Sequence, residues 1–424
     1  MAPMVHAGRT PLRVLALEYG ADLVYTEEIV DQKLLDSTRV VNEALGTIDY
    51  VIEDDVVLRI ATKKEQNKCI VQVGTNDAER VAMVAKLIGN DAAGIDLNMG
   101  CPKPFSISGG MGAALLTQPD KVKQILTSLV SASSVPVSCK IRVLDKLEDT
   151  LSLVQLIEKC GVDAIGVHGR RKDERRSDRN RIEEIYEVAR SVTIPVIANG
   201  ASGTIMKYDD IEEFRTQCGA SSVMVARKAL TNPSIFRKSG ILASMEEEIT
   251  NFLKIVCEYD ENFTMTKYVV QRILGSAQEF DPRGQETVNA ASVLEICKAW
   301  SVENTYDYYK NLRNKEKNHE FDPETGICFV DVTFPPRKLK SYCASGTPKC
   351  VLNSFCDASQ IKRPIYHCKY RSRDKRYEAV IEVGEQKFLS RISQPNKKMA
   401  EQVAALAALI GMKQREKLKG DWEE

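Results

Sequence analysis

The chain of 424 residues contains no Cys-x-x-Cys pair and only four histidines, although it has 12 cysteines. Zinc modules need closely spaced Cys and His ligands, so the sequence indicates neither a zinc module nor a disulfide framework. It also lacks an apolar run near the roughly 20 residues of a membrane-spanning helix, and no signal-peptide pattern opens it. Because free thiols are typical of a reducing compartment, we expect a cytoplasmic protein. We also expect a monomer without a metal ion or a membrane anchor.

Net charge is absent as well, because 59 Lys and Arg balance 59 Asp and Glu, but the charges are unevenly distributed. Residues 329–424 carry 19 basic against 11 acidic side chains, a net charge of +8, which leaves −8 on the rest. A basic end on an acidic body indicates a polyanionic partner, with drift of surface charge between domains as the alternative. The length predicts more than one domain, and the 43% hydrophobic content is sufficient for sizeable cores.

Short apolar, β-branched runs recur through residues 1–239, and amphipathic helical stretches separate most of them. Such runs are typical of buried parallel strands. Counting the start of the chain, eight β/α units predict a TIM (β/α)8 barrel whose first strand is truncated. An open doubly wound sheet is the alternative, but no Gly-x-Gly-x-x-Gly follows the first strand. The expected strands span residues 1–5, 22–25, 70–73, 94–97, 137–141, 164–167, 195–198 and 222–225, and the clearest helices span 78–88, 121–130, 147–160 and 210–218.

Cys101 lies in a turn after one of these strands, between Gly100 and Pro102 and before the glycine-rich segment 108–112. A free cysteine in a helical apolar pattern is ordinarily a core residue, which is how we interpret most of the others. A turn between Gly and Pro is a different context, and it favours a functional role. With Asn98 close by to bind an amide edge, Cys101 is a candidate to pass a proton to a planar substrate.

Polar residues stand at the carboxyl ends of the expected strands, where barrel enzymes place their sites. A buried lysine is costly unless an anion or a polarised group accompanies it. Lys140, His168 and Gln72 around one barrel mouth therefore favour a polar cofactor with a phosphate, although each alone could be a satisfied polar side chain. The last two loops are the common place for that phosphate. The residues at these ends are Pro3, Met4, Gln72, Asn98, Cys101, Lys140, Arg142, His168, Arg170, Asn199, Gly200, Ala226 and Arg227.

Six motifs carry a family resemblance, in this order: Met-Ala-Pro-Met (1–4), Asn-Met-Gly-Cys-Pro (98–102), Gly-Gly-Met-Gly-Ala-Ala-Leu-Leu (109–116), Cys-Lys-Ile-Arg (139–142), Val-His-Gly-Arg (167–170) and Ile-Ala-Asn-Gly (197–200). Together they resemble the FMN-dependent tRNA dihydrouridine synthases over roughly residues 1–310. Within this family the chain is most similar to the eukaryotic enzymes that modify uridine 20 of the tRNA D-loop. An appended C-terminal domain supports this subgroup.

The resemblance implies a flavin mechanism. In this mechanism NADPH would reduce FMN, the flavin would give a hydride to C6 of uracil, and the Cys101 thiol would protonate C5. A thiol with an ordinary pKa of about 8.5 is mostly protonated at neutral pH and can act as this acid. The implied substrate-binding residues are Asn98, Arg142 and Arg170. The implied FMN-binding residues are Pro3 and Met4 near the ring, Gln72, Lys140 and His168 at the flavin or its ribityl chain, and Asn199, Gly200, Ala226 and Arg227 at the phosphate.

Beyond the barrel the apolar spacing becomes helical, which predicts a small helical domain over residues 240–312, with helices around 249–259, 268–277 and 288–299. A charged and then proline-bearing stretch, 313–341, is typical of a linker, and its basic extension holds Arg337, Lys338 and Lys340.

Residues 342–413 predict the order α-β-β-β-α, with a helix over 349–359, strands over 365–370, 377–383 and 387–392, and a final helix that begins with Lys397 and Lys398. Residues 414–424 form a charged tail. This pattern resembles a double-stranded RNA-binding domain. Lysines at a helix N-terminus suit phosphates, because side-chain charge and helix dipole both favour an anion. A solvated lysine pair is the alternative.

Three departures from the family patterns are visible. The chain begins at the end of the first strand, Ser108 stands where many relatives have a basic residue, and the loop 371–375 lacks the usual Gly-Pro-x-His. Two other functions stay open: a non-catalytic tRNA-binding protein on a decayed barrel, and a flavin reductase of free pyrimidines. The barrel retains Asn98, Cys101, Lys140 and His168, which argues against the loss of catalysis. The RNA-binding domain argues against a free pyrimidine base as the substrate.

Overall fold

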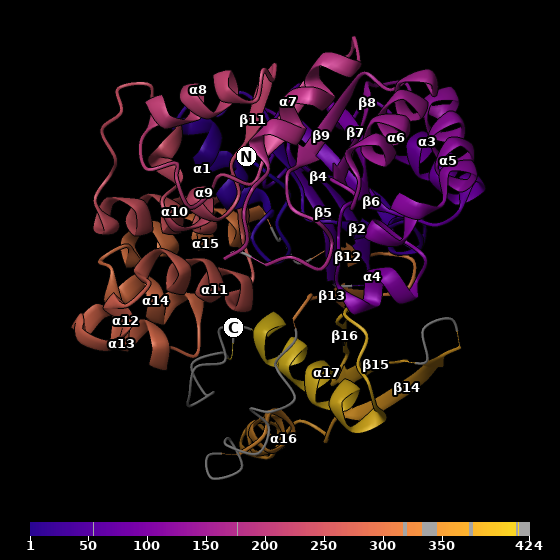
Figure 1. Ribbon diagram of the computed structural model, residues 1–424. Coiled ribbons are helices and arrows are strands. Elements are labelled where there is room, and N and C mark those ends of the chain that lie inside the picture. Colours follow the sequence, from indigo (N-terminus) through magenta and orange to yellow (C-terminus); the bar gives the residue numbers. More distant parts are fainter. Residues whose placement is uncertain are drawn as a thin grey trace. The chain divides into compact units, whose positions relative to one another are not determined.

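A computed structural model describes residues 1–53, 55–175, 177–316, 320–332, 346–372, 376–412 and 414 (Figure 1). The chain divides into two compact units, Met1–Lys310 and Asn311–Glu424. Arg337, Lys338 and Lys340 of the expected basic extension lie outside the described residues. Within the described ranges, no helix is long and apolar enough to cross a membrane.

The first unit contains the expected parallel barrel, whose strands pair with their neighbours in chain order. These strands are β1 (Val24–Tyr25), β6 (Cys69–Gly74), β7 (Gly94–Met99), β8 (Val137–Arg142), β9 (Ala164–His168), β10 (Val196–Asn199) and β11 (Ser222–Met224). A further short strand, β2 (Ile29–Val30), pairs with the end of β6. Every residue of β6 and β7 is buried, which explains why these segments are apolar apart from Gln72, Asp96 and Asn98.

The prediction of a strand over residues 1–5 is wrong, because none of these residues lies in a strand. Ala2 donates its backbone N–H to Val225 at 2.9 Å, and Tyr25 donates to Met1 at 3.2 Å, so Met1 and Ala2 bridge β11 and β1. The carbonyl of Met4 then accepts the N–H groups of Ala7 and Gly8, which turns the chain. These bonds place residues 1–2 at the remaining position of the eight-membered ring.

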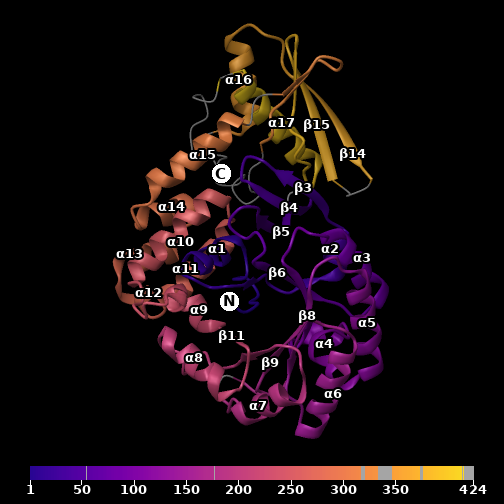
Figure 2. The same cartoon turned by 90° about the horizontal axis from the view of Figure 1, so that it is seen from above.

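Helices cover the outside of the barrel, as Figure 2 shows for α3, α5, α6, α7 and α8. Each presents one apolar face inward. In α3, for example, Asp77 caps the first turn by accepting from Glu79 and Arg80, and Val81, Val84, Ala85 and Ile88 are buried. The helices are α1 (Thr10–Glu18), α3 (Ala78–Ile88), α5 (Pro119–Ala132), α6 (Leu147–Lys159), α7 (Ile182–Ser191), α8 (Tyr208–Gln217) and α9 (Arg227–Thr231).

Sequence reasoning missed an insertion between β2 and β6. After the short α2 (Asp31–Leu35), three antiparallel strands form a separate sheet: β3 (Thr38–Asn42), β4 (Thr47–Ile52) and β5 (Asp55–Ala61). The edge strand β3 is almost entirely exposed, so its sequence carries no burial signal. Only the buried faces of β4 and β5, with Tyr50 and Ile60, join the main core.

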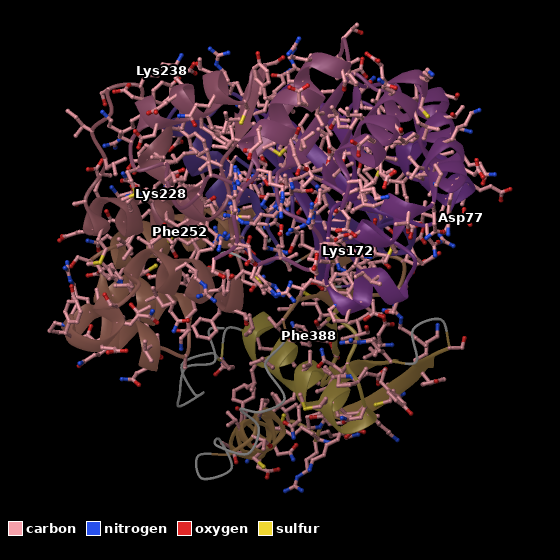
Figure 3. All side chains as sticks on the ribbon, in the orientation of Figure 1. Asp77, Lys172, Lys228, Lys238, Phe252 and Phe388 are labelled. Carbon is pink, nitrogen blue, oxygen red and sulfur yellow. The ribbon has the colours of Figure 1, made fainter. Side chains whose placement is uncertain are left out.

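The helical region after the barrel begins with α10 (Met245–Tyr259) and α11 (Phe263–Leu274) and continues through α12 (Ala277–Phe280), α13 (Pro282–Asn289), α14 (Val293–Ala299) and α15 (Glu303–Glu316). Its core residues, including Phe252 (labelled in Figure 3), belong to the same hydrophobic cluster as the barrel core. The two regions therefore share one continuous core.

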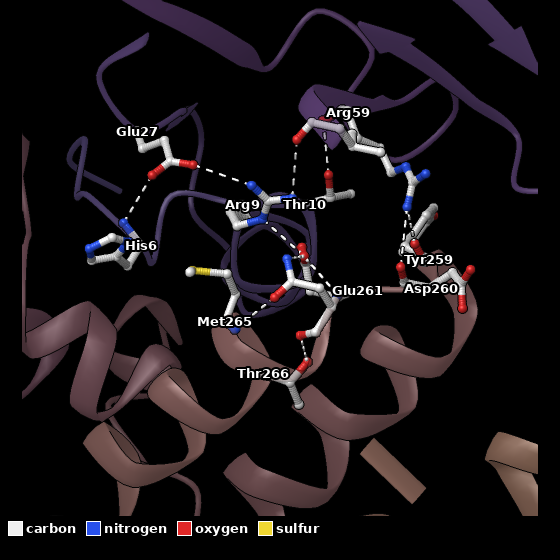
Figure 4. A network of polar contacts seen from close by, with 12 residues as sticks. His6, Arg9, Thr10, Glu27, Arg59, Tyr259, Asp260, Glu261, Met265 and Thr266 are labelled. Carbon is white, nitrogen blue, oxygen red and sulfur yellow. Dashed lines mark hydrogen bonds and ion pairs between the residues drawn. The ribbon is translucent and has the colours of Figure 1, made fainter. Parts of the chain in front are cut away.

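A polar network also joins these two regions (Figure 4). Arg9 bonds to Glu261 at 2.9 Å and to Glu27 at 3.4 Å, while Arg59 donates to the carbonyls of Tyr259 and Asp260. Asp260 has a left-handed φ of 52° at the end of α10, where the chain reverses into α11. The guanidinium groups thus hold this turn against the barrel mouth.

The second unit has the expected α-β-β-β-α order: α16 (Pro348–Ala358), β14 (Ile365–Arg371), β15 (Arg376–Val383), β16 (Gln386–Leu389) and α17 (Lys397–Gly411). Small residues of α17 let it pack closely on the sheet, and Gly411 meets the ring of Phe388 (Figure 3). The range 313–341 differs from a plain linker, because β12 (Glu320–Asp322) and β13 (Ile327–Phe329) extend the sheet through pairing of β13 with β16. Val330 is buried in the core of this unit.

Candidate active site at the barrel mouth

The turn that carries Cys101 is held by Asn98, at the end of β7. The Oδ1 atom of Asn98 accepts the backbone N–H groups of Gly100 at 2.9 Å and Cys101 at 3.0 Å. The carbonyl of Cys101 in turn accepts the N–H of Ala113 at 2.9 Å. Gly112, with a φ of 57°, allows this approach, because a Cβ atom there would lie 2.7 Å from the Cys101 carbonyl oxygen. Cys101 is therefore a partly buried thiol on a fixed turn, as the sequence predicts.

A buried chain of hydrogen bonds fixes the orientation of Asn98. Its Nδ2 donates to Oε1 of Gln72 at 3.3 Å, and Nε2 of Gln72 donates to Asp96 at 2.8 Å. Ser138 donates its hydroxyl to the other oxygen of Asp96 at 2.6 Å. Burial raises the pKa of Asp96 to about 6, against the opposing effects of Gln72, Ser138 and Lys140. Because a carboxylate accepts only, it determines which end of the Gln72 amide faces Asn98.

Lys140 lies next to this chain, because it is in register with Asn98 on the neighbouring strand. Burial and the charge of Arg142 lower the pKa of Lys140 to about 8, while Asp96 and Cys101 act in the opposite direction. The ammonium group can therefore gain or lose its charge close to neutral pH. Lys140 is partly buried, and a lysine in such a position favours an anionic or polarised ligand beside it.

Two arginines and His168 stand at the ends of β8 and β9. Arg142 donates to the carbonyls of Gly100 and Arg171, both at 2.9 Å, and Arg170 donates to the carbonyls of Asp178 and Gly200, both at 2.7 Å. Burial, followed by the charges of Lys140, Arg142, Arg170 and Arg227, holds the pKa of His168 far below its usual range. His168 is thus a neutral imidazole in a strongly cationic surrounding.

These residues border a cavity of about 450 Å³. The cavity brings together seven residues singled out in the sequence, namely Arg142, His168, Arg170, Asn199, Gly200, Ala226 and Arg227. Gln72, Asn98, Cys101 and Lys140 do not border it directly. Pro3 is partly exposed, and Met4 packs partly against the core. Sequence reasoning missed six lining residues, Pro102, Lys103, Pro104, Glu174, Arg175 and Ser202, of which Arg175 could have been found from the run of basic residues at 170–181.

The cavity fits a ligand that carries a phosphate. Its charged lining is mainly cationic, and Glu174, its carboxylate, is paired with Arg181 at 2.6 Å. Nearby, both polar atoms of the Asn180 amide are buried without a hydrogen-bond partner among the described residues. Gly200, with a φ of 120°, lies against this amide, since a Cβ atom there would be 2.2 Å from the Asn180 Oδ1 atom. The amide of Asn199 donates to the carbonyl of Met224 at 2.9 Å, which fixes this side chain at the cavity wall.

Glu28 was also missed. Burial raises the pKa of its carboxyl, and its polar neighbours are the thiol of Cys101, the hydroxyl of Ser106 and the amide of Asn98. The sequence signal for Glu28 is that two consecutive glutamates follow a buried strand. The structure separates their roles, because Glu27 bonds to Arg9 and to the backbone N–H of His6, whereas Glu28 is buried. In the part of the chain that the structure describes, no group of three or more His, Cys, Asp or Glu side chains could hold a metal ion.

The predicted RNA-binding lysines of the second unit lie where the sequence places them. Lys397 and Lys398 are exposed in the first turn of α17, and Asn396 caps this helix by accepting the N–H of Met399 at 3.0 Å. The two ammonium groups therefore face solvent at the positive end of a 15-residue helix.

Comparison with known proteins identifies both units. The Dihydrouridine synthase (Dus) family matches residues 1–325, and the double-stranded RNA binding motif matches residues 348–411. A tRNA-dihydrouridine(20) synthase (NAD(P)+) of Schizosaccharomyces pombe is 40% identical over 363 residues, which cover 82% of this chain and 73% of that protein. The Saccharomyces cerevisiae protein of the same name is 36% identical over 340 residues, 75% of this chain and 88% of the yeast protein. A human tRNA-dihydrouridine(20a/20b) synthase (NAD(P)+)-like protein is 32% identical over 240 residues, 55% and 69% of the two chains.

Proposed function

We propose that this chain, which belongs to the dihydrouridine synthase family, reduces the C5–C6 double bond of uridine 20 in the D-loop of tRNA. The observation that carries the proposal is the Cys101 thiol, fixed by Asn98 on a turn beside a cationic cavity, in a chain that also contains an RNA-binding motif. The named yeast relatives, which align with most of this chain, support position 20. The RNA-binding motif favours tRNA over a free pyrimidine as the substrate.

FMN suits the cavity because its phosphate would meet Asn199, Gly200, Ala226 and Arg227, all of which line it. When bound and reduced by NADPH, FMN supplies the hydride that C6 of uracil receives. We assign Gln72, Lys140 and His168 to the flavin and its ribityl chain, and Pro3 and Met4 to the side of the ring. A cationic Lys140 stabilises negative charge that develops on a ligand beside it.

Cys101 donates the proton that C5 of uracil receives. Burial, followed by the charge of Glu28, raises the pKa of this thiol, so Cys101 is protonated at neutral pH and can act as an acid. Asn98 uses one N–H for Gln72, which leaves its second N–H for the uracil carbonyl. Arg142 and Arg170 lie at the cavity wall, where they can bind the substrate nucleotide.

We assign tRNA capture to the second unit, through Lys397 and Lys398 on α17 and through Arg337, Lys338 and Lys340. Phosphate contacts by lysine and arginine give affinity without reading the base sequence. The uridine must leave its loop to reach Cys101, as bases do in enzymes that act on them. The structure shows no disulfide bond among the described cysteines, which suits the reducing cytoplasm, where we place the reaction.

The test uses the purified full-length chain with NADPH and tRNA that lacks dihydrouridine. We expect yellow protein that releases FMN on heating, and dihydrouridine that maps to position 20. Free uridine should stay unreduced under the same conditions. Colourless protein that binds tRNA without reducing it would instead support a non-catalytic RNA-binding role, and reduction of free uracil would support a pyrimidine reductase.

A further inference from the structure

Glu28 connects β1 to β2 and turns its carboxyl inward. Both carboxyl oxygens are buried and have no aligned hydrogen-bond partner among the described residues. Gly74, which pairs with Val30 of β2, makes room for this group, because a Cβ atom at position 74 would lie 2.6 Å from Oε1 of Glu28. A buried carboxyl without a partner is costly, so its position needs a reason.

The groups around this carboxyl belong to the Cys101 turn. The thiol of Cys101, the hydroxyl of Ser106 and the amide of Asn98 act on it, and each favours its charged form against the effect of burial. The Ser106 hydroxyl is likewise buried, with no hydrogen-bond partner in the described ranges. Ser106 and Cys101 meet at Gly112, where a Cβ atom would lie 2.4 Å from Oγ of Ser106 and 3.0 Å from Cβ of Cys101. The three side chains thus form one small cluster, defined as Glu28, Cys101 and Ser106.

Charges of both signs act on the Cys101 sulfur. Lys140 and Arg142 on β8 attract a thiolate, whereas Glu28 repels it. Burial and Glu28 prevail, so the pKa of Cys101 is raised. Without Glu28, burial alone would oppose the two neighbouring cations, so the pKa of Cys101 would fall and more of the thiol would become thiolate, which is a nucleophile and cannot act as an acid.

We propose that Glu28 is a positioning residue for the proton of Cys101, and that the carboxyl and the thiol form a pair that holds one proton between turnovers and regains it after each proton transfer. This inference rests on the proposed function, in which Cys101 is the acid. When the S–H bond breaks and C5 of uracil takes the proton, the sulfur becomes a thiolate beside the carboxyl. Two adjacent negative charges are unfavourable, so the pair takes one proton back from water and the S–H bond forms again.

The test measures alkylation of Cys101 by iodoacetamide across neutral and alkaline pH in the full-length protein, with each cysteine quantified by mass spectrometry. Glu28→Gln should move the Cys101 profile to lower pH. Because the thiolate reacts, alkylation at neutral pH should become about tenfold faster for each pH unit by which the profile moves. Ser106→Ala should move the profile to higher pH, because this hydroxyl favours the thiolate. Cys350 is exposed and serves as the reference, whose profile should not move.

The two variants separate charge from loosening of the fold. Loosening of the fold would expose the thiol and move the Cys101 profiles of both Glu28→Gln and Ser106→Ala to lower pH. That result would overturn the proposal. An unchanged profile in Glu28→Gln would overturn it as well. If Glu28→Gln does not fold, Glu28→Asp retains the charge and should keep the profile close to that of the wild type. Alkylation needs neither tRNA nor NADPH. Shifted profiles in a protein that makes no dihydrouridine would therefore support the pair and refute the proposed function.

Discussion

The side-chain oxygen of Asn98 accepts the backbone N–H of Cys101 at 3.0 Å, so the residue expected to bind the substrate also shapes the turn that presents the acid. The same oxygen accepts the N–H of Gly100 at 2.9 Å, and the amide nitrogen donates to Gln72. Three of the four hydrogen-bonding positions of this amide are thereby engaged by the protein. Asn98 can act on substrate only through its remaining N–H, for which the carboxyl of Glu28 is a competing acceptor.

Asn98→Ala should therefore reduce dihydrouridine formation more than it weakens tRNA binding. The variant releases the turn, and a displacement of about 1 Å can cost 10²-fold in rate, so a loss near this size is expected. Single-turnover reduction of tRNA and a separate binding titration distinguish the two effects. Asn98→Asp retains the acceptor for the backbone of Cys101 but loses the N–H donors. Compared with Asn98→Ala, it should therefore disturb the Cys101 turn less, and its main defect should be weaker binding of uracil. A variant with weak binding and an unchanged rate would contradict this account.

Cys101→Ala should retain FMN and lower dihydrouridine formation by about 10²–10⁴-fold, the usual contribution of a general acid. Oxidation of NADPH by the flavin should continue, because this half of the reaction needs no proton from Cys101. Flavin content, NADPH consumption without tRNA and the yield of dihydrouridine give the three measurements. Cys139→Ala, at a buried cysteine on β8, is the matched control. Near-normal product formation by Cys101→Ala would remove the thiol from the mechanism.

Asp96→Asn should move the pH dependence of flavin reduction to lower pH. Burial and Arg142 lower the pKa of Lys140 to about 8, and Asp96 opposes them. The ammonium charge is therefore present below about pH 8 and lost above it, and without the carboxylate it is lost at a lower pH. An asparagine can still accept from Gln72 and bond to Ser138, so the fold should persist.

The measurement for Asp96→Asn is the rate of flavin reduction by NADPH as a function of pH. Ser138→Ala is the control, because it removes one hydrogen bond to Asp96 and leaves the charge. The profile of Ser138→Ala should move less than that of Asp96→Asn. An identical profile in wild type and Asp96→Asn would mean that the charge of Lys140 does not act on the flavin.

The sequence predicted those parts of the molecule in which burial and periodicity agree. The strands β6 to β11 and the helices between them follow from continuous apolar runs and amphipathic stretches, and α16 to α17 follow from alternation and helical spacing. The sheet β3–β5 was missed because the edge strand β3 is exposed and shows no apolar pattern. β12 and β13 were missed because each has three residues, too few for a period to be visible.

At the site, residue types at strand ends pointed to one barrel mouth, and the structure places His168, Arg142 and Arg170 around one cavity. The sequence could not show that Asn98 holds the Cys101 turn, because this depends on which way one amide faces. Glu28 was invisible for a related reason. Glu27 and Glu28 are adjacent and identical in type, and only the turn of the backbone after β1 decides that one carboxyl pairs with Arg9 and the other is buried.

Our last prediction concerns tRNA binding by the second unit. Because β12, β13 and Val330 belong to this unit, its removal should begin after Glu316, at the end of α15. The shortened chain should still be reduced by NADPH, since the first unit has its own core. It should bind tRNA weakly and with a flatter salt dependence, because fewer phosphate contacts release fewer counterions.

Lys397→Ala with Lys398→Ala should reproduce part of this loss and lower the slope of log affinity against log salt by about one per lysine. Both side chains are exposed at the start of α17, so the double variant should fold normally. Lys387→Ala is the matched control in the same unit, because Lys387 pairs with Glu382 at 3.2 Å and already has an anionic partner. If the double variant and the control have equal slopes, the lysines of α17 do not contact phosphates. If full-length and shortened chains bind tRNA equally well with equal slopes, capture of tRNA belongs to the barrel unit, where the basic run at 170–181 beside the cavity is the next surface to change.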